Sequence, residues 1–326
     1  MTTSPIKYQQ TRASMQKMHS IRAMKGLSLI ELLIGITISS LLLLGVSSIY
    51  LNSRQTDQFT SELSRIQESG RHAVEFLARD IRMAGYQGCL DPATVAVTII
   101  ANNPPTTDFF ATALRGFEVP DGSWADGTEF DGTVMETNAL IGSDVIAIQG
   151  ATVANATLVG NMSASNANIQ ISDNTMGLGQ DDVVVIADCQ NADMFRITNA
   201  ANGGGNVTLT HANSTNTTNR LSAPYNTDAQ IMFFESVAYY IAATGRQSEH
   251  GEPINALYRF TDNMSDTVAP TFIAEELIEG VDSMQILYGE RHATGNLRYV
   301  TADNVANMQL VESIQLGLLL SGSRSI

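Results

Sequence analysis

The sequence is poor in cysteine, tryptophan and basic residues. Its 326 residues include two cysteines, one tryptophan and 18 Lys and Arg residues against 33 Asp and Glu, for a formal net charge of −15. Two cysteines are too few for a disulfide-rich scaffold or for a Cys₄ zinc site. This acidity excludes bulk affinity for nucleic acid and for anionic lipid, because both need a basic surface. The length is enough for one large domain or two ordinary ones.

Catalytic signatures are also missing. The sequence has no H-E-x-x-H, G-x-S-x-G, P-loop or dinucleotide-binding pattern. The histidines are far apart in the chain, at His19, His72, His211, His250 and His292. Three Asp-Gly pairs are compatible with calcium ligation, but they lack EF-hand spacing and a closing Glu, so we expect turns there. These pairs are Asp121-Gly122, Asp126-Gly127 and Asp131-Gly132. The sequence predicts no catalytic residue, metal ligand or cofactor, and we expect no enzymatic activity.

Acidic residues are absent before Glu31, and lysines are absent after Lys25. Residues 1–26 therefore carry a charge of +5, and the rest of the chain has 13 basic residues against all 33 acids. A basic, acid-free start followed by an apolar run is typical of a targeting segment, which does not belong to the folded domain.

The apolar run is Leu27–Leu51, with Glu31 as its only charge. The 22 uncharged residues 32–53 span roughly 33 Å as a helix, enough to cross the hydrocarbon core of a bilayer. The basic flank favours a cytoplasmic N-terminus and sends the residues after Tyr50 outward. No A-x-A cleavage site follows the run, so we expect it to remain as an anchor.

Glu31 is the anomaly in this run. A carboxylate in a membrane helix costs ~2.5–3.5 kcal/mol at mid-bilayer and less near the interface. It is either a tolerated interfacial residue or a functional charge with a partner.

K-G-L-S-L-I-E-L-L at Lys25–Leu33 resembles the class III signal of type IV pilins and of type II secretion pseudopilins. The resemblance implies that a prepilin peptidase cuts after Gly26, that Leu27 is N-methylated, and that Glu31 is the fifth mature residue. Glu31 would then pair with the amine of an adjacent subunit, so that desolvation of both charges is offset only in the fibre.

Beyond the anchor, apolar residues recur at i+3 and i+4, which predicts one stripe of an amphipathic helix. The stripe consists of Phe59, Leu63, Ile66, Gly70, Ala73 or Val74, Leu77 and Ile81. We expect the opposite face to be solvated; its charged residues are Arg54, Asp57, Glu62, Arg65, Glu68, Arg71, Glu75, Arg79, Asp80 and Arg82. The helix should end near Ala84-Gly85, where glycine supplies a left-handed terminus. Counted from Leu27, it would be ~87 Å long.

After residue 90 the apolar period changes from 3.6 to 2, which is typical of antiparallel strands. The predicted strands are Thr94–Ile100, Asp144–Gln149, Thr152–Val159, Asn168–Ser172, Val183–Ala187, Met194–Thr198, Val207–Thr210, Ile231–Ile241, Ala256–Phe260, Met284–Tyr288 and Val311–Leu320. We expect one short helix at Pro270–Gly280, with Glu275 and Glu276 near its start. The stretch from Gly150 to Asp228 is rich in Asn, Thr, Ala and Gly and predicts turns and exposed loops around its strands.

Cys89 and Cys189 are the two cysteines of this predicted exported head. Outside the cytoplasm we expect them to be joined, with two separate thiols as the alternative. A bridge that closes about 100 residues is worth roughly 4–5 kcal/mol in the loop-entropy model.

F-L-A-R-D-I-R-M-A-G-Y-Q-G-C at Phe76–Cys89 is similar to the segment that closes the stem helix in the PilW family of minor pilins. The segments Asp181–Cys189 and Val281–Gly289 are also PilW-like. The resemblance implies an α+β, pilin-like lollipop fold. Its parts would be a leader (1–26), a transmembrane half (27–53) and an amphipathic half (54–85) of the stem helix, and a β-rich extracellular head (86–326).

The resemblance further implies a structural minor pilin of the type IV pilus, in a tip complex that primes assembly. The implied partners are prepilin peptidase, the other minor pilins, the major pilin and a tip adhesin. The protein would cross the inner membrane once, with a cytoplasmic N-terminus, and then move to the periplasm and the extracellular pilus. The alternatives are a minor pseudopilin of type II secretion and, from another class, a membrane-anchored extracellular binding protein or enzyme.

Overall fold

One continuous helix, α1 (Leu29–Arg82), is the longest element of the chain. The computed structural model describes residues 26, 28–91, 94–104, 106, 108–109, 111–128, 130–203, 205–248, 251–263, 271–292 and 295–322. The chain forms two compact units, which divide between Asp57 and Gln58, within α1. Residues 58–82, which belong to the second unit, are called the outer half of α1 below.

In the first unit, every residue from 28 to 57 is exposed. This part of α1 is apolar, and its few hydroxyl groups bond to the helix itself. Thr37 Oγ1 donates to the carbonyl oxygen of Leu33 at 2.9 Å, and Ser40 Oγ donates to that of Ile36 at 2.7 Å. Such bonds satisfy hydroxyl groups internally, as a hydrocarbon environment requires.

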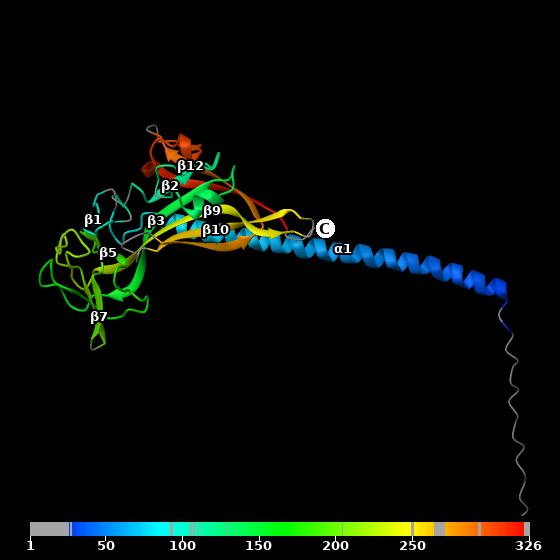
Figure 1. Ribbon diagram of the computed structural model, residues 1–326, viewed down its shortest axis with the longest axis horizontal. Helices are drawn as coiled ribbons and strands as arrows, with labels where there is room; N and C mark the ends of the chain where they lie inside the picture. The colour runs from blue at the N-terminus through cyan, green and yellow to red at the C-terminus, as the bar shows by residue number, and fades with distance from the viewer. Residues whose placement is uncertain are drawn as a thin grey trace, which may run out of the picture. The chain divides into compact units, whose positions relative to one another are not determined.

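The second unit is built on an eight-stranded sheet with β9 at its centre. One edge of β9 pairs with β3, and the other pairs first with β5 and then with β10, all antiparallel (Figure 1). The strands are β1 (Thr98–Ile99), β2 (Leu114–Phe117), β3 (Val145–Thr157), β5 (Val183–Ala187), β6 (Ala192–Arg196), β9 (Gln230–Gln247), β10 (Pro253–Asn263) and β11 (Thr271–Glu279). Only the short β1–β6 pair is parallel among the described strands.

Two three-stranded antiparallel sheets complete this unit. One has the order β13-β12-β14, from Leu297–Val300, Val281–Arg291 and Val311–Leu320. The other has the order β4-β8-β7, from Ile169–Ile171, Asn206–Thr210 and Asn199–Gly203. The short helices are α2 (Val134–Asn138) and the 3₁₀ turns η1 (Ala302–Asn304) and η2 (Met308–Leu310).

The outer half of α1 packs where the main sheet meets the β13-β12-β14 sheet. Ala73 and Leu77 are completely buried there, against alternate residues of β9 such as Tyr239 and Ile241. The residues between them, including Tyr240, face the opposite side of the sheet and pack around Phe130, Met135 and Phe260. Alternate burial of this kind is the period-2 pattern of a sheet covered on both faces.

The α+β class, with a long N-terminal apolar helix and a mostly antiparallel head, is confirmed. The boundaries of β5 and β14 coincide with the predicted strands Val183–Ala187 and Val311–Leu320. The helix also ends as predicted, since α1 stops at Arg82 and Gly85 has a φ of +70°. Gly85 then donates its N–H to Gln149 O at 2.8 Å, which joins the end of the helix to β3.

The helix predicted at Pro270–Gly280 is wrong, because residues 271–279 form the strand β11. Glu275 lies opposite Arg259 of β10 in that pairing, and Glu276 forms an ion pair with Arg246 of β9. The two acids that suggested a helix start therefore lie opposite or bind arginines of neighbouring strands, and this tertiary context overrides the local helix propensity.

Other local expectations were incomplete. The strands predicted at Asp144–Gln149 and Thr152–Val159 are one strand, β3, whose register with β9 shifts between Val153 and Ala156. In the Asn- and Thr-rich stretch, β4 and β8 correspond to the predicted strands Asn168–Ser172 and Val207–Thr210, and β7 joins them in a three-stranded sheet. The elements β2, β7, β13 and α2 were not predicted.

Candidate functional site: the processing segment and the stem

Glu31 lies in the first turn of α1, and its side chain bonds to the start of its own helix. Its Oε2 accepts from the backbone N–H of Ser28 at 3.0 Å, which satisfies one of the free amides at the helix N-terminus. A carboxylate in the first turn also interacts favourably with the helix dipole. Glu31 is exposed, so the carboxylate is accessible to a cation from outside the chain.

The predicted processing site directly precedes this turn. A Cβ built on Gly26 would meet no atom within 4 Å, so the glycine is not enclosed by protein. Leu27, the predicted first mature and methylated residue, lies outside the described residues. Cleavage and methylation therefore stay predictions.

The helix following Glu31 is apolar on all sides. Its large exposed side chains include Leu32, Ile36, Leu41, Leu44, Ile49 and Leu51. α1 is the one helix in the described ranges that is long and apolar enough to cross a membrane, and its apolar window is not buried inside the protein. This helix is compatible with a membrane anchor.

The outer half of α1 is held by both packing and polar contacts. Tyr239 of β9 donates its hydroxyl proton to Asp80 Oδ2, and Arg79 Nε binds the other carboxylate oxygen at 3.1 Å. Burial and the Asp80 carboxylate both raise the pKa of Tyr239, so the phenol stays protonated and donates. Gly70 lies against Leu320 of β14, and a Cβ there would meet the Leu320 methyl groups at 3.5 Å, an ordinary contact distance.

Glu62 departs from the predicted solvated face of the helix. Its exposure is only 5%, and its Oε1 lies 3.4 Å from Nη1 of Arg65. Asp80 is also partly buried, and it accepts a hydrogen bond from Tyr239 of β9. The prediction of a fully solvated charged face is therefore wrong at Glu62 and incomplete at Asp80.

A disulfide joins Cys89 to Cys189, with 5.1 Å between the Cα atoms. Cys89 follows the end of α1 by seven residues, and Cys189 lies in the turn between β5 and β6. The bridge therefore joins the chain beyond the stem to the main sheet, and the predicted pairing is confirmed.

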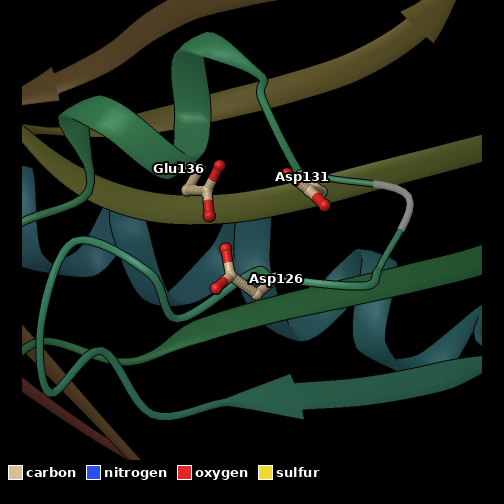
Figure 2. A group of neighbouring side chains, drawn as sticks. All are labelled: Asp126, Asp131 and Glu136. Atoms are coloured by element: carbon tan, nitrogen blue, oxygen red, sulfur yellow. The ribbon is translucent and has the colours of Figure 1, made fainter.

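The Asp-Gly segments form turns, as predicted, with φ values of +75° at Gly127 and +71° at Gly132. They also bring three carboxylates together, from Asp126, Asp131 and Glu136, with ligand oxygens within 4.8 Å of one another (Figure 2). Glu136 comes from α2, and its Oε2 accepts from Gly132 N at 2.7 Å. Asp131 Oδ2 accepts from Gly127 N at 3.2 Å. Backbone amides thus account for the positions of these two carboxylates, as is common in turns and helix caps.

Two further buried carboxylates were missed by the sequence reasoning. Asp193 is completely buried and accepts from Ser222 and from the Tyr225 hydroxyl at 2.6 Å. Asp144 is 5% exposed and accepts from Ile286 N at 2.7 Å. Burial raises the pKa of both carboxyl groups, for Asp144 to about 6. Their roles in the described contacts are structural. Asp193 of β6 binds the loop that contains Ser222 and Tyr225, and Asp144, which precedes β3, binds β12.

The histidines do not gather into a site in the part of the chain that the structure describes. His72 lies 3.6 Å from Glu68 on the same helix, and buried His211 bonds to the carbonyl oxygen of Ala167 at 3.0 Å. His292 lies at the end of β12. His19 and His250 lie outside the described residues.

The described residues combine an exposed apolar N-terminal helix that is compatible with a membrane anchor, an amphipathic continuation of that helix and a disulfide-bonded, mostly antiparallel head. Residues 238–326 match the family model PilW, described as Type IV Pilus-assembly protein W. The match runs from β9 to the end of the chain, far from the predicted N-terminal signal, and supports a PilW-family type IV pilus protein. Neither a curated protein nor a solved structure gives a significant match to the chain.

Proposed function

We propose that the chain is a structural, non-enzymatic minor pilin that is cleaved after Gly26 and built into a type IV pilus. The proposal rests on two features at opposite ends of the chain. The signal-like segment leads directly into a 54-residue helix with Glu31 in its first turn, and the other end of the chain matches the PilW family. The family match supports association with type IV pilus machinery; the minor pilin role is our inference.

In this proposal Glu31 selects the register of assembly. Cleavage leaves a cationic amine on Leu27, and methylation keeps the charge. Pairing this amine with Glu31 of a neighbouring subunit offsets desolvation of both charges, which an isolated subunit in the membrane does not achieve. The pair therefore favours the assembled fibre over the free subunit.

The size of the head favours a place at the pilus tip. Residues beyond the stem form three sheets, and so bulky a head would hinder close lateral packing within a shaft. A tip complex that primes assembly fits this geometry, with other minor pilins, the major pilin and a tip adhesin as partners. A minor pseudopilin of type II secretion is the alternative, because the signal-like segment suits both systems.

The test is a comparison of processing and fibre incorporation. The wild-type chain should lose residues 1–26 in cells with prepilin peptidase, retain them in cells without it, and occur in sheared fibres. Glu31→Ala should be processed normally but be missing from the fibres. Glu68→Ala, which removes an exposed carboxylate of the same helix, should be incorporated like the wild type. An intact N-terminus in peptidase-positive cells, or Glu31→Ala in fibres at the wild-type level, would refute the proposal. Co-purification with secretion pseudopilins instead of pilins would select the alternative.

A further inference from the structure

A groove of about 440 Å³ runs beside the outer half of α1. One wall is the helix from Glu62 to Phe76, and the other is the end of β11 together with Gly280 and Ser321. Gly280 has a φ of +81°, accepts from Ser321 N at 2.9 Å and donates to Asn255 O at 2.8 Å. These bonds to two other segments fix the turn that forms the second wall.

The carboxylate of Glu62 lies in this groove and is poorly compensated. Arg65 is its one partner within the described ranges, at 3.4 Å, and the Arg65 side chain is 55% exposed. Burial removes the hydration of a carboxylate, and a single long contact to a half-solvated guanidinium does not replace it. No donor in the described ranges bonds to the second oxygen of Glu62, and this oxygen is not fully enclosed, so a cation that enters the groove can reach it.

The other charged groups of the groove do not supply such a cation. Glu279 adds a second carboxylate, which binds Arg246 at 3.2 Å outside the groove lining. His72 lies 3.6 Å from Glu68. The remaining wall includes the apolar side chains of Ile66, Phe76 and Leu277.

An apolar wall with a buried carboxylate matches the chemistry of a long basic side chain. The methylene stem of Lys or Arg covers apolar surface, while its cationic head seeks an acceptor. We propose that this groove receives a Lys or Arg side chain from a neighbouring pilus subunit, with Glu62 as its counter-ion. This inference rests on the proposed function, since it takes another subunit of the pilus as the donor.

The experiment uses the full chain in pilus-producing cells, with a photo-cross-linking residue in place of Ser69 on the groove wall. Irradiation should link the chain to another pilus subunit, at a site near a Lys or Arg. Glu62→Gln should lower the cross-linked yield roughly tenfold, the factor expected for loss of one charge-assisted hydrogen bond. Glu68→Gln, the matched control at a side chain that is 75% exposed, should leave the yield unchanged.

A charge exchange separates recognition from a folding defect. Glu62→Lys should abolish the cross-link, and replacing the partner cation by Glu should restore it, a rescue that a merely unstable head would not show. Protein level and formation of the Cys89–Cys189 disulfide check the folding of each variant.

Three results would overturn the inference. One is a Ser69 cross-link that maps within the same chain, including one to the segment 323–326 that carries Arg324. Another is a yield unaffected by Glu62→Gln, and the third is no cross-link at all. The fibre fraction distinguishes the two proposals. If the wild-type chain is present in sheared fibres and any of these results is obtained, only the groove inference fails; absence from fibres defeats the proposed function as well.

Discussion

Removal of the disulfide should lower the stability of the head considerably, because the unfolded chain gains conformational freedom. The perturbation is Cys89→Ser with Cys189→Ser, at two exposed residues 100 positions apart in sequence. Because both positions are exposed, the change removes little packing, and the main effect is the freedom gained by the unfolded chain. The loop-entropy model gives about 4–5 kcal/mol for a loop of this length. That is a large share of the ~5–15 kcal/mol that stabilises an ordinary domain.

The assay is urea unfolding of the processed chain in detergent, followed by tryptophan fluorescence of Trp124, the single tryptophan. The double variant should unfold at lower urea with a steeper dependence on urea, because its unfolded state is less compact. Wild-type protein unfolded in the presence of a reductant should behave like the double variant, which serves as the control. A loss below about 1 kcal/mol in both samples would refute the argument that the bridge acts mainly on the unfolded chain.

Two further predictions concern the seam between the main sheet and β12. Gly116→Ala would place a Cβ 2.1 Å from the Tyr288 hydroxyl oxygen, so we expect urea unfolding to show a loss of about 1–3 kcal/mol in the free energy of unfolding. Gly122→Ala is the control and should be neutral, because a Cβ there would meet no atom within 4 Å. Equal stability of the two variants would contradict this. Burial and the nearby Glu118 carboxyl raise the pKa of Asp144 to about 6, so its contribution to stability is present below about pH 4 and is lost as the pH rises to 6. Asp144→Asn should flatten the pH dependence by about 2 kcal/mol between pH 4 and 7, and an unchanged slope would show that another group is responsible.

The parts of the fold that depend on local pattern could be predicted from the sequence. The i+3/i+4 stripe predicts α1 because a helix is made of local contacts, and Gly85 marks its end. β5 is five consecutive buried residues, and β14 has alternating exposure, both of which are recognisable strand patterns.

The failures arise where pairing with distant residues decides the structure. β11 resembles a helix start because of its adjacent acids, yet β10 provides hydrogen-bonding partners for its backbone. β7, with the sequence N-A-A-N-G, has no strand signal of its own and is held by β8. In contrast, the alternation in I-Q-I of β4 and V-T-L of β8 is a local strand signal, and both strands correspond to the predicted strands Asn168–Ser172 and Val207–Thr210.

The candidate site divides in the same way. Glu31 and the cysteine pair could be named in advance, since spacing, compartment and count are properties of the sequence. The convergence of Glu136 with Asp126 and Asp131 could not, because it depends on α2, a five-residue helix with no clear periodicity. Asp144 and Asp193 become buried through partners 142 and 32 residues away. No local pattern reports contacts of that range.

Glu62 is the instructive case, because a usable signal was present. At about 100° per residue, the eleven positions from Glu62 to Ala73 bring the two side chains to within about 20° of the same direction. Ala73 is completely buried, so the helix geometry already places Glu62 toward the sheet and not on the solvated face. The residue type argued for exposure, but direction is fixed by the backbone, and β11 with the Gly280 turn covers that direction. A charged residue aligned with the buried stripe of a stem is therefore better treated as a candidate for a specific partner than as one more solvated charge.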